Sequence, residues 1–383
     1  MRTSIPIFVS LGLSLGLVGC GDNSGTGASP DAALPGVDAP TATIGLTLYD
    51  YTRAVDVSPD GRIAAFEDVS QGLTSTLVFV DTATGVATPK TEIGDVTRDF
   101  ASGLSNNGRV TALHGDPVQA GVWSEATGWI DLPAAHPAGC DADIAGAWDI
   151  SADGAVVVGL AWNGCDAEAF RWTDTSGTGV YTTLDVIGKA YADSTHPPTN
   201  RATVISDDGK VIAGFAQNDV LDRSAAMWTA DGHGVLLDPA NLDAPSEILA
   251  IDADGSTLAG IVGFDGFVWT KADGQTPLVR FDSALPSDRV YPNAITADGA
   301  TVFGGVGDPF SGIPVAFVWT KAAGMRPLID VATAAGVSIP TGTILNSVLG
   351  ASADGTVLVG TAMDAAGNGK TFALVLPASA LAP

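Results

Sequence analysis

Aspartate recurs at similar intervals along the chain, in segments that we predict to be loops between β-strands. Its carboxylate oxygens suit calcium or another hard cation. Aspartate is also a common loop residue, because its side chain bonds to nearby backbone groups. The spacing matches neither an EF-hand nor a nonapeptide calcium repeat, so we favour ordinary loop chemistry over a calcium site. The carboxylates concerned are Asp68, Asp116, Asp166, Asp219, Asp265, Asp308 and Asp364.

Histidine supplies a second set of candidate metal ligands. His114, His136 and His196 fall in three successive predicted loops, whereas His233 is expected at the opposite end of the molecule. Three imidazoles could hold zinc with a fourth position open for hydrolysis. Their spacing matches no zinc motif, and exposed loop histidine is the alternative interpretation.

The sequence lacks the motifs that would identify a familiar class of enzyme. The chain contains no His-Glu-x-x-His zinc motif, no phosphate-binding loop and no dinucleotide fingerprint. The sequence therefore assigns no catalytic residue and no cofactor, and an enzyme built on this chain would assemble its site from scattered residues.

A short phrase repeated seven times predicts the elements that position these side chains. Each copy ends in Asp-Gly or Asn-Gly, and successive glycines lie 44 to 56 residues apart, the period of a four-stranded propeller blade. Asp-Gly favours a hairpin turn, and the Ser, Thr or Asp that opens the phrase can bond back to the turn backbone. The copies are Ser58-Pro59-Asp60-Gly61, Ser105-Asn106-Asn107-Gly108, Ser151-Ala152-Asp153-Gly154, Ser206-Asp207-Asp208-Gly209, Asp252-Ala253-Asp254-Gly255, Thr296-Ala297-Asp298-Gly299 and Ser352-Ala353-Asp354-Gly355.

Apolar runs on either side of each turn predict the first and second strands of a blade. Five copies carry a glycine five residues after the turn glycine, which indicates close backbone approach or a bulge; Phe66 and Leu113 stand there in the first two copies. The five glycines are Gly159, Gly214, Gly260, Gly304 and Gly360.

A third strand with a tryptophan follows in most copies. The tryptophans could form a platform for sugars or bases, but packing between neighbouring blades is the interpretation that we favour, because stacked sheets need a large side chain at one repeated position. A fourth strand is expected after a further turn, as at residues 235–237 and 327–329. The third strands are residues 170–173, 226–229, 267–270 and 317–320, with 122–124 as a weaker copy.

The pattern predicts an all-β fold, a seven-bladed β-propeller of four-stranded antiparallel blades that spans residues 44–383. The last blade ends with its third strand at residues 372–376, which leaves its outer position empty. The β-prone residues 44–49 could fill that position and close the ring with an N-terminal strand.

Two families share parts of this pattern. The phrase Ser58-Pro59-Asp60-Gly61, followed by residues 62–66, resembles the blade motif of Tol-system propellers. The Asp-Gly, Gly and Phe-x-Trp-Thr pattern of the later blades resembles HAF-repeat extracellular proteins of bacteria. The resemblance covers about residues 44–376 and implies a propeller fold and an exported compartment. It brings no catalytic residues, because the matching residues are structural.

The N-terminus predicts export and lipid anchoring. Residues 1–19 read as a signal peptide with Arg2 in its basic region and an apolar stretch at residues 5–18. Residues 17–20 resemble a bacterial lipobox, so Cys20 is the predicted lipidated N-terminus. Residues 20–43 then form a flexible tether rich in Gly, Ser, Ala, Pro and Asp. Gly21 after the cysteine favours the outer membrane or cell surface of a Gram-negative bacterium.

Two cysteines remain for a disulfide once Cys20 is lipidated. Cys140 and Cys165 fall in loops that an up-and-down blade places at the same end. Export permits a disulfide, and a bridge closing a loop of this size would stabilise the fold by about 3 kcal/mol.

Charge limits the partners. The formal net charge is −26, which makes nucleic acid and anionic membrane surfaces poor partners, so that only the lipid anchor would contact the membrane. We predict a monomer that binds a protein or carbohydrate at the cell envelope. The longest insertions, residues 185–200, 217–223, 308–314 and 330–346, share one end with the predicted cysteine loops, and we call this end the loop rim.

The predicted function is that of a lipid-anchored envelope module that binds or scaffolds through the loop rim. The alternative is a cation-dependent envelope hydrolase or lyase that acts on a polysaccharide or an ester. The candidate binding residues are His114, Asp116, His136, Asp166, His196, Asp219, Asp265, Asp308, Phe310 and Asp364.

Overall fold

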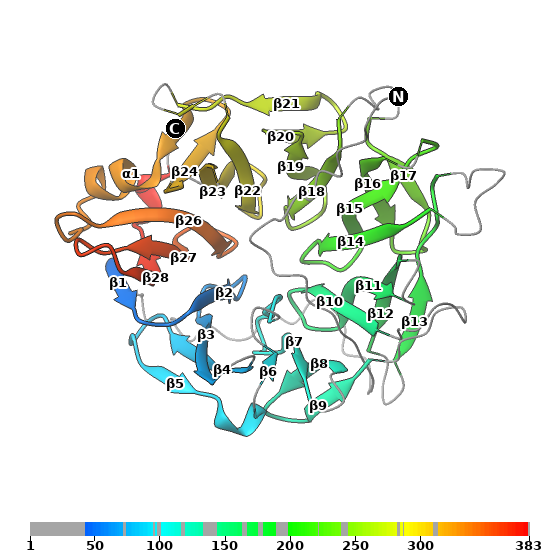
Figure 1. Cartoon of the computed structure of the whole chain (residues 1–383), viewed down its shortest axis with the longest axis horizontal. Coiled ribbons are helices and arrows are strands. Elements are labelled where there is room, and N and C mark those ends of the chain that lie inside the picture. Colours follow the sequence, from blue (N-terminus) through cyan, green and yellow to red (C-terminus); the bar gives the residue numbers. More distant parts are fainter. Residues whose placement is uncertain are drawn as a thin grey trace, which may run out of the picture.

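The computed structural model arranges antiparallel β-sheets in a ring around a central axis (Figure 1). It describes residues 43–71, 74–94, 96–97, 101–115, 119–132, 144–162, 167–174, 179–188, 198–220, 222–238, 244–281, 284–285, 287–308 and 313–381. The predicted signal peptide, Cys20 and nearly all of the predicted tether lie outside these residues. No helix in the described ranges is long and apolar enough to span a membrane.

Five of the sheets have four strands, as the repeat predicts. In each, strands that are consecutive in the sequence pair with one another, except that β1 joins the last sheet. The sheets are β10 (Ile144–Ile150), β11 (Val156–Trp162), β12 (Ala167–Thr173) and β13 (Val180–Thr183); β14 (Asn200–Ile205), β15 (Val211–Gln217), β16 (Arg223–Thr229) and β17 (Gly234–Leu236); β18 (Ser246–Ile251), β19 (Thr257–Val262), β20 (Asp265–Thr270) and β21 (Gly274–Leu278); β22 (Arg289–Ile295), β23 (Thr301–Gly307), β24 (Val315–Thr320) and β25 (Gly324–Pro327); and β26 (Ile344–Ala351), β27 (Val357–Met363), β28 (Gly369–Val375) and β1 (Gly45–Tyr49).

The first part of the chain forms one eight-stranded sheet instead of two separate ones. The short strand β6 pairs with β4 on one side and with β7 on the other, and it thereby joins the two halves. The sheet contains β2 (Arg53–Val57), β3 (Ile63–Gln71), β4 (Thr74–Asp81), β5 (Ala87–Pro89), β6 (Val96–Thr97), β7 (Val110–His114), β8 (Gln119–Ser124) and β9 (Gly128–Asp131), followed in the ring by the sheet that starts with β10.

The repeated phrase forms hairpin turns. All seven turn glycines have positive φ, between 67° and 75°, a conformation that only glycine adopts without strain. In the first turn the N–H of Ile63 donates to Ser58 Oγ at 3.0 Å, and Ser58 Oγ donates to Asp60 Oδ1 at 2.8 Å. The predicted contact between the first side chain of the phrase and the turn backbone is therefore confirmed.

The seven turns are also bonded to one another around the axis. The N–H of Ala353 donates to Pro59 O at 2.8 Å, which links the turn of the last sheet to the first turn in the chain. Asp60 N–H in that first turn donates to Asn106 Oδ1 at 2.7 Å. The remaining links are Asn106 N to Ala152 O, Ala152 N to Asp207 O, Asp208 N to Ala253 O, Ala253 N to Ala297 O, and Ala297 N to Ala353 O.

The five glycines after the turns lie where the sheet backbone is closest. Gly159 on β11 faces a bulge in β10, and a Cβ on it would overlap the carbonyl oxygen of Gly146. The predicted close approach is confirmed at all five positions. The other overlapping carbonyls belong to Arg201 for Gly214, Glu247 for Gly260, Tyr291 for Gly304 and Ser347 for Gly360.

The third-strand aromatic residues pack between sheets. Trp172, Trp228, Phe170, Phe267 and Phe317 are almost fully buried. They lie in apolar clusters that combine side chains from adjacent sheets. Packing is therefore the structural role of these side chains.

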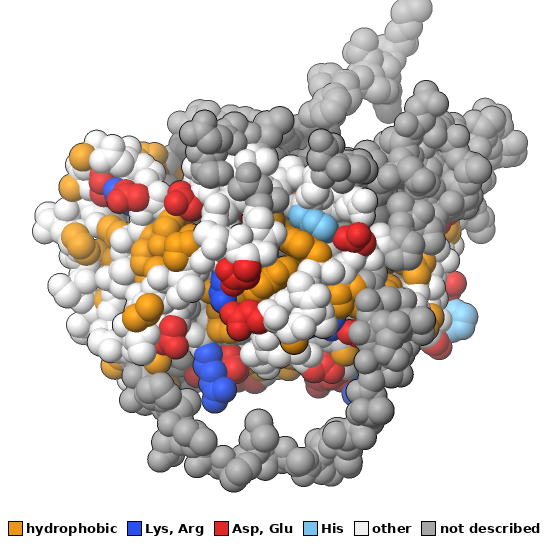
Figure 2. Space-filling view, turned by 90° about the horizontal axis from the view of Figure 1, so that it is seen from below, with side chains coloured by type: hydrophobic (Ala, Val, Ile, Leu, Met, Phe, Trp, Pro, Cys, Tyr) orange, Lys and Arg blue, Asp and Glu red, His pale blue; other side chains and the backbone are white. Residues whose placement is uncertain are grey.

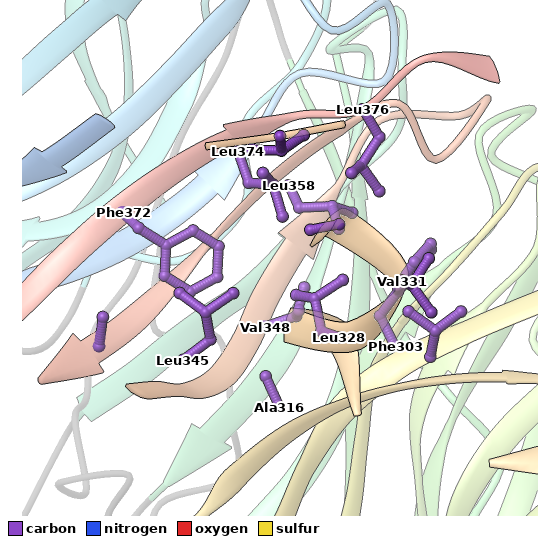
Figure 3. Close-up of a cluster of buried hydrophobic side chains, with 14 of the residues drawn as sticks. Phe303, Ala316, Leu328, Val331, Leu345, Val348, Leu358, Phe372, Leu374 and Leu376 are labelled. Atoms are coloured by element: carbon purple, nitrogen blue, oxygen red, sulfur yellow. The ribbon is translucent and has the colours of Figure 1, made fainter. Parts of the chain in front are cut away.

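The helix α1 (Leu328–Ala334) replaces part of a predicted strand. Residues 327–329 were expected to belong to a fourth strand, but β25 ends at Pro327. Leu328, Val331 and Ala332 then face one core at helical spacing. Figure 3 shows Leu328 and Val331 beside Val348 and Phe303 in this core.

The strand β1 occupies the outer position of the last sheet. Gly45 pairs with Val375 and Tyr49 with Thr371, in an antiparallel register. Leu46 and Leu48 pack against the core of Figure 3, so this strand adds apolar contacts as well as backbone hydrogen bonds.

Candidate functional site

An axial cavity of about 600 Å³ lies where the sheets meet. Its wall extends from the turn residues Pro59, Ala253, Ala297 and Ala353 to Thr52, near the loop-rim end of β2. Inner strands from all the sheets contribute to it, including β2, β10, β14, β18, β22 and β26. A ligand of small-molecule size would fit this volume.

The repeats differ from one another at one position of the cavity wall. This position lies three residues before the first residue of each turn. Its side chains range in size from serine to tryptophan. Trp148 makes one side of the wall bulky, while glycine and alanine line much of the rest. The seven residues are Val55, Ser102, Trp148, Thr203, Leu249, Asn293 and Leu349.

Two carboxylates in the cavity wall bond adjacent repeats together. Asp56 accepts hydrogen bonds from the N–H of Val57 at 2.8 Å and from the N–H of Leu104, in the next repeat, at 3.1 Å. Asp149 accepts from its neighbour Ile150 and, across to the following sheet, from Ile205, both at 2.8 Å. These carboxylates therefore stabilise the ring.

The environment of these carboxylates favours their protonated forms. Burial raises the pKa of Asp149 to about 7, although its two backbone N–H donors act in the opposite direction. Burial raises the pKa of Asp56 well above its usual value, and the charge of Asp149 raises it further. Asp207, in the fourth turn, has its pKa raised by burial and then by the charges of Asp208 and Asp252. Across the described residues, no three His, Cys, Asp or Glu side chains are placed to hold one metal ion.

A stack of aromatic rings and arginines runs from the cavity wall to the loop rim. The guanidinium carbon of Arg201 lies 4.9 Å from the ring centre of Trp148 and 5.2 Å from that of Phe215. The guanidinium carbon of Arg223 lies 4.4 Å from the Phe215 ring. Both arginines pair with Glu247 on β18. We call these five residues the arginine stack.

The arginine stack places two cations close together. Burial lowers the pKa of Arg223, and the charge of Arg201 lowers it further, while Glu247 opposes both effects. Arg201 is bonded to Glu247, whose side chain also accepts a hydrogen bond from Thr203 Oγ1 at 2.9 Å. Arg201 Nε and Trp148 Nε1 are buried and have no hydrogen-bond partner among the described residues.

His114 lies at the end of a strand instead of in a rim loop as predicted. It is the last residue of β7, and its ring stacks on Trp129 with 3.8 Å between ring centres. Its Nε2 lies 3.0 Å from Asp131 Oδ1. Burial lowers the pKa of His114, and Asp131 partly offsets this. The described contacts of His114 thus belong to the packing of one sheet edge.

Two of the predicted acidic ligands have local partners. Asp265, predicted in a loop, begins β20 and lies 2.7 Å from Arg280 Nη2. Asp364 accepts hydrogen bonds from the N–H groups of Ala366 and Asn368 in its own turn, both at 2.9 Å. Asp68, predicted in a loop, lies within β3.

The remaining candidates divide into two groups. Asp219 and Asp308 lie in the predicted loops after β15 and β23. The others fall outside the described residues, so the zinc and disulfide predictions are untested. They are Asp116, His136, Asp166, His196, Phe310, Cys140 and Cys165.

The view of the molecule's edge in Figure 2 shows acidic side chains spread among hydrophobic ones and fewer basic side chains, in keeping with the net charge. The arginine stack differs from this general surface, and the sequence analysis did not identify it. One available signal was Trp148, which stands in a first strand instead of a third.

Comparison with solved structures identifies the class of fold as a β-propeller. Oligogalacturonate lyase from Vibrio parahaemolyticus aligns with 95% of this chain and 98% of its own, at 11% identity and a TM-score of 0.52. The β-propeller domain of the Trilobed protease from Pyrococcus furiosus aligns with 85% of this chain and 96% of its own, at 9% identity and a TM-score of 0.52. At these identities the similarity concerns the fold.

The comparisons assign no family. TolB from Acinetobacter baumannii aligns with 87% of this chain and 96% of its own, at 10% identity and a TM-score of 0.37, which is too low to bear on the Tol resemblance. No family model matches the chain, and no curated protein matches it. The propeller part of the predicted resemblance is therefore supported, and the Tol and HAF parts stay predictions.

Proposed function

We propose that this protein is a lipid-anchored binding module of the cell envelope, which recognises a protein or carbohydrate through its loop rim and axial cavity. One observation carries the proposal. The turn positions repeat closely around the ring, whereas the cavity position occupied by Trp148, Thr203 and Asn293 differs between repeats. A recognition surface needs such asymmetry, and a packed scaffold does not.

Seven blades closed by the N-terminal strand are the architecture that we infer for this module. Dividing the eight-stranded sheet at β6 gives two blades, and the five four-stranded sheets supply the others. The inference is supported by the seven linked turns and by the pairing of β1 with β28.

Export and anchoring rest on the N-terminal sequence. The stretch that ends at Cys20 supports a lipid anchor on the outer membrane or cell surface of a Gram-negative bacterium. Cys20→Ser should release the protein from the membrane fraction or block its processing. Unchanged membrane fractionation of the variant, with no soluble form, would contradict the anchor.

Binding is favoured over the alternative of a cation-dependent hydrolase or lyase. The carboxylates of Asp56 and Asp149 are engaged by backbone N–H groups, so their described role is structural. One solved structure of similar fold is an oligogalacturonate lyase in complex with manganese, and its 14% identity extends the comparison to fold alone. Stoichiometric calcium, zinc or manganese in the purified protein would favour the hydrolase or lyase alternative.

Site-specific photo-crosslinking in the producing cell tests the binding face. Leu285 and Ile313 are 62% and 51% exposed, and both lie in connections at the loop-rim end. A photoreactive amino acid at either position should give covalent adducts with an envelope component. Matched positions at the other end, the exposed turn residues Asp153 and Asp254, should give none. Adducts from Asp153 and Asp254 alone would overturn the proposed face.

A further inference from the structure

The arginine stack holds one more positive charge than its carboxylate neutralises. Arg201 and Arg223 share Glu247, whose side chain is 4% exposed. Arg201 takes the closer position, while Arg223 Nη1 lies 3.9 Å from Glu247 Oε2, which is too long for a hydrogen bond. One guanidinium charge is therefore left over, in a chain whose net charge is −26.

Arg223 is both held in place and accessible. Its guanidinium group lies over the Phe215 ring, and its side chain is 49% exposed. Within the described part of the chain, its guanidinium N–H groups make no hydrogen bond. A guanidinium group resting on a ring presents its N–H donors at its edge, in a fork that matches the two oxygens of a carboxylate.

We propose that Arg223, backed by Arg201, binds a carboxylate group of the ligand at the loop rim. A carboxylate carries one negative charge, which equals the charge that Glu247 leaves unneutralised. A phosphate monoester carries about −1.5 to −2 at neutral pH and would exceed it. This inference rests on the proposed binding function and names the chemistry of its ligand.

The stacking contacts explain why this site would be selective. Because Phe215 lies against both guanidinium groups and Trp148 lies against that of Arg201, little side-chain freedom is lost when a ligand binds. A lysine at position 223 would keep the charge and lose the planar fork, so charge alone would not replace the arginine.

Side-chain NMR of the purified, [15N]arginine-labelled protein tests the site directly. The probes are glucuronate and N-acetylalanine, which represent a sugar acid and a peptide C-terminus, with glucose and N-acetylalanine amide as their neutral counterparts. We expect an acid to shift the Arg223 Nε–Hε signal, assigned by its loss in Arg223→Lys. Arg62, whose Nε lies 3.6 Å from Asp60 Oδ2, serves as the internal control.

The acid that shifts the Arg223 Nε–Hε signal identifies the chemistry of the ligand. A shift with glucuronate alone identifies a sugar acid, and a shift with N-acetylalanine alone identifies a peptide chain end. The proposal is overturned where neither acid shifts Arg223, or where the neutral counterparts shift it equally.

Affinity measurements on variants provide the second readout. We expect Arg223→Gln to weaken binding of the effective acid at least tenfold and Arg223→Lys to give an intermediate loss. Arg62→Gln, at an exposed arginine in the first turn, should leave it unchanged. Equal affinity of Arg223→Gln and the unsubstituted protein would contradict the proposal, and the melting temperature of each variant checks folding.

Failure of this inference and failure of the proposed function can be distinguished. Crosslinks from Leu285 or Ile313 without carboxylate binding would keep the binding face and remove the carboxylate. Carboxylate binding at Arg223 together with crosslinks from Asp153 and Asp254 alone would keep the carboxylate site and remove the proposed face.

Discussion

The carboxylate of Asp56 occupies the space that a side chain on Gly350 would need. A Cβ at position 350 would lie 2.5 Å from Asp56 Oδ1 and 3.0 Å from the nitrogen of Val57. Gly103 meets the backbone at Asp149 in a similar way, since its Cβ would lie 2.8 Å from the nitrogen of Ile150 and 3.0 Å from the Cα of Asp149. In both places an aspartate two residues before its turn faces a glycine at the same position of the preceding repeat.

Gly350→Ala should therefore destabilise the fold. The added methyl group must displace the Asp56 carboxylate or the backbone at Val57, and overpacking of this kind costs about 1–3 kcal/mol. Urea denaturation followed by circular dichroism measures the loss. Gly369→Ala is the control, because a Cβ on that strand glycine meets nothing within 4 Å.

The same contact predicts coupling between the two positions. Asp56→Ala leaves the N–H groups of Val57 and Leu104 without their acceptor, so it should destabilise by itself. The double variant Asp56→Ala, Gly350→Ala should lose less than the sum of the two single losses, because the carboxylate is no longer displaced. Strict additivity would show that the alanine methyl group does not meet the carboxylate.

The contribution of Asp149 to stability should fall as the pH rises from about 4 to 7. The pKa of Asp149 is raised to about 7 in the folded protein, above the usual value of about 3.9 for an unfolded chain. The folded state therefore binds the proton more tightly, and the stabilisation from this group is complete below pH 4 and lost as the pH passes 7. The raised pKa of Asp56 acts in the same direction.

Urea midpoints at several pH values measure this dependence. Asp149→Asn removes this titrating group, so the variant should lose less stability than the unsubstituted protein as the pH rises from about 4 to 7. Asp50→Asn, at a residue whose side chain is 89% exposed, is the control and should follow the unsubstituted protein. Parallel curves for Asp149→Asn and the unsubstituted protein would show that Asp149 does not titrate in this range.

Removal of β1 should lower the melting temperature. A chain that begins at Asp50 lacks the hydrogen bonds from residues 45–49 to β28 and the apolar contacts of Leu46 and Leu48, and it exposes the edge of β28. A chain that begins at Thr41 retains them and should melt like the full-length protein. Equal melting temperatures for the two chains would refute a closing role for β1.

The turns and strands were predictable because their signals are local. Gly154 needs a positive φ, and Gly159 faces a carbonyl that leaves no room for a Cβ, so both positions require glycine whatever the rest of the chain does. A phenylalanine on the third strand pairs with the glycine in four of these five repeats, whereas Gly214 pairs with Ala226. Phe170, for example, pairs with Gly159, and its ring fills the space beside the glycine.

In the first repeat the large side chain stands on the second strand instead of the third. Phe66 replaces the glycine there, and its partner on the third strand is Val78 instead of phenylalanine. One large side chain is thus kept in the pair, on the other strand. The sequence showed the missing glycine but not this exchange, because the pairing register had to be known first.

The arginine stack was not predictable, because it joins distant parts of the chain. Trp148, Arg201 and Glu247 come from three different sheets. Arg201 and Glu247 each stand five residues before the first residue of a turn, but the repeat does not show that their side chains meet. Histidines and aspartates in loops were predicted as binding residues because these residue types commonly bind metals and ligands. The described members of that set, such as Asp265 and Asp364, turned out to pair with local groups. Which residues meet across sheets depends on the packing of the ring.

The last prediction concerns Cys140 and Cys165, which lie outside the described residues. Ile144 on β10 pairs with Trp162 on β11. In the sequence Cys140 stands four residues before Ile144 and Cys165 three residues after Trp162, and extended segments of these lengths are long enough for a bridge. Peptide mapping of the exported protein under non-reducing conditions should find the two joined, and reduction should remove about 3 kcal/mol of stability. Cys140→Ser with Cys165→Ser should reproduce the loss, while Cys20→Ser should leave the peptide pair intact. Complete alkylation of both cysteines as free thiols would contradict the bridge.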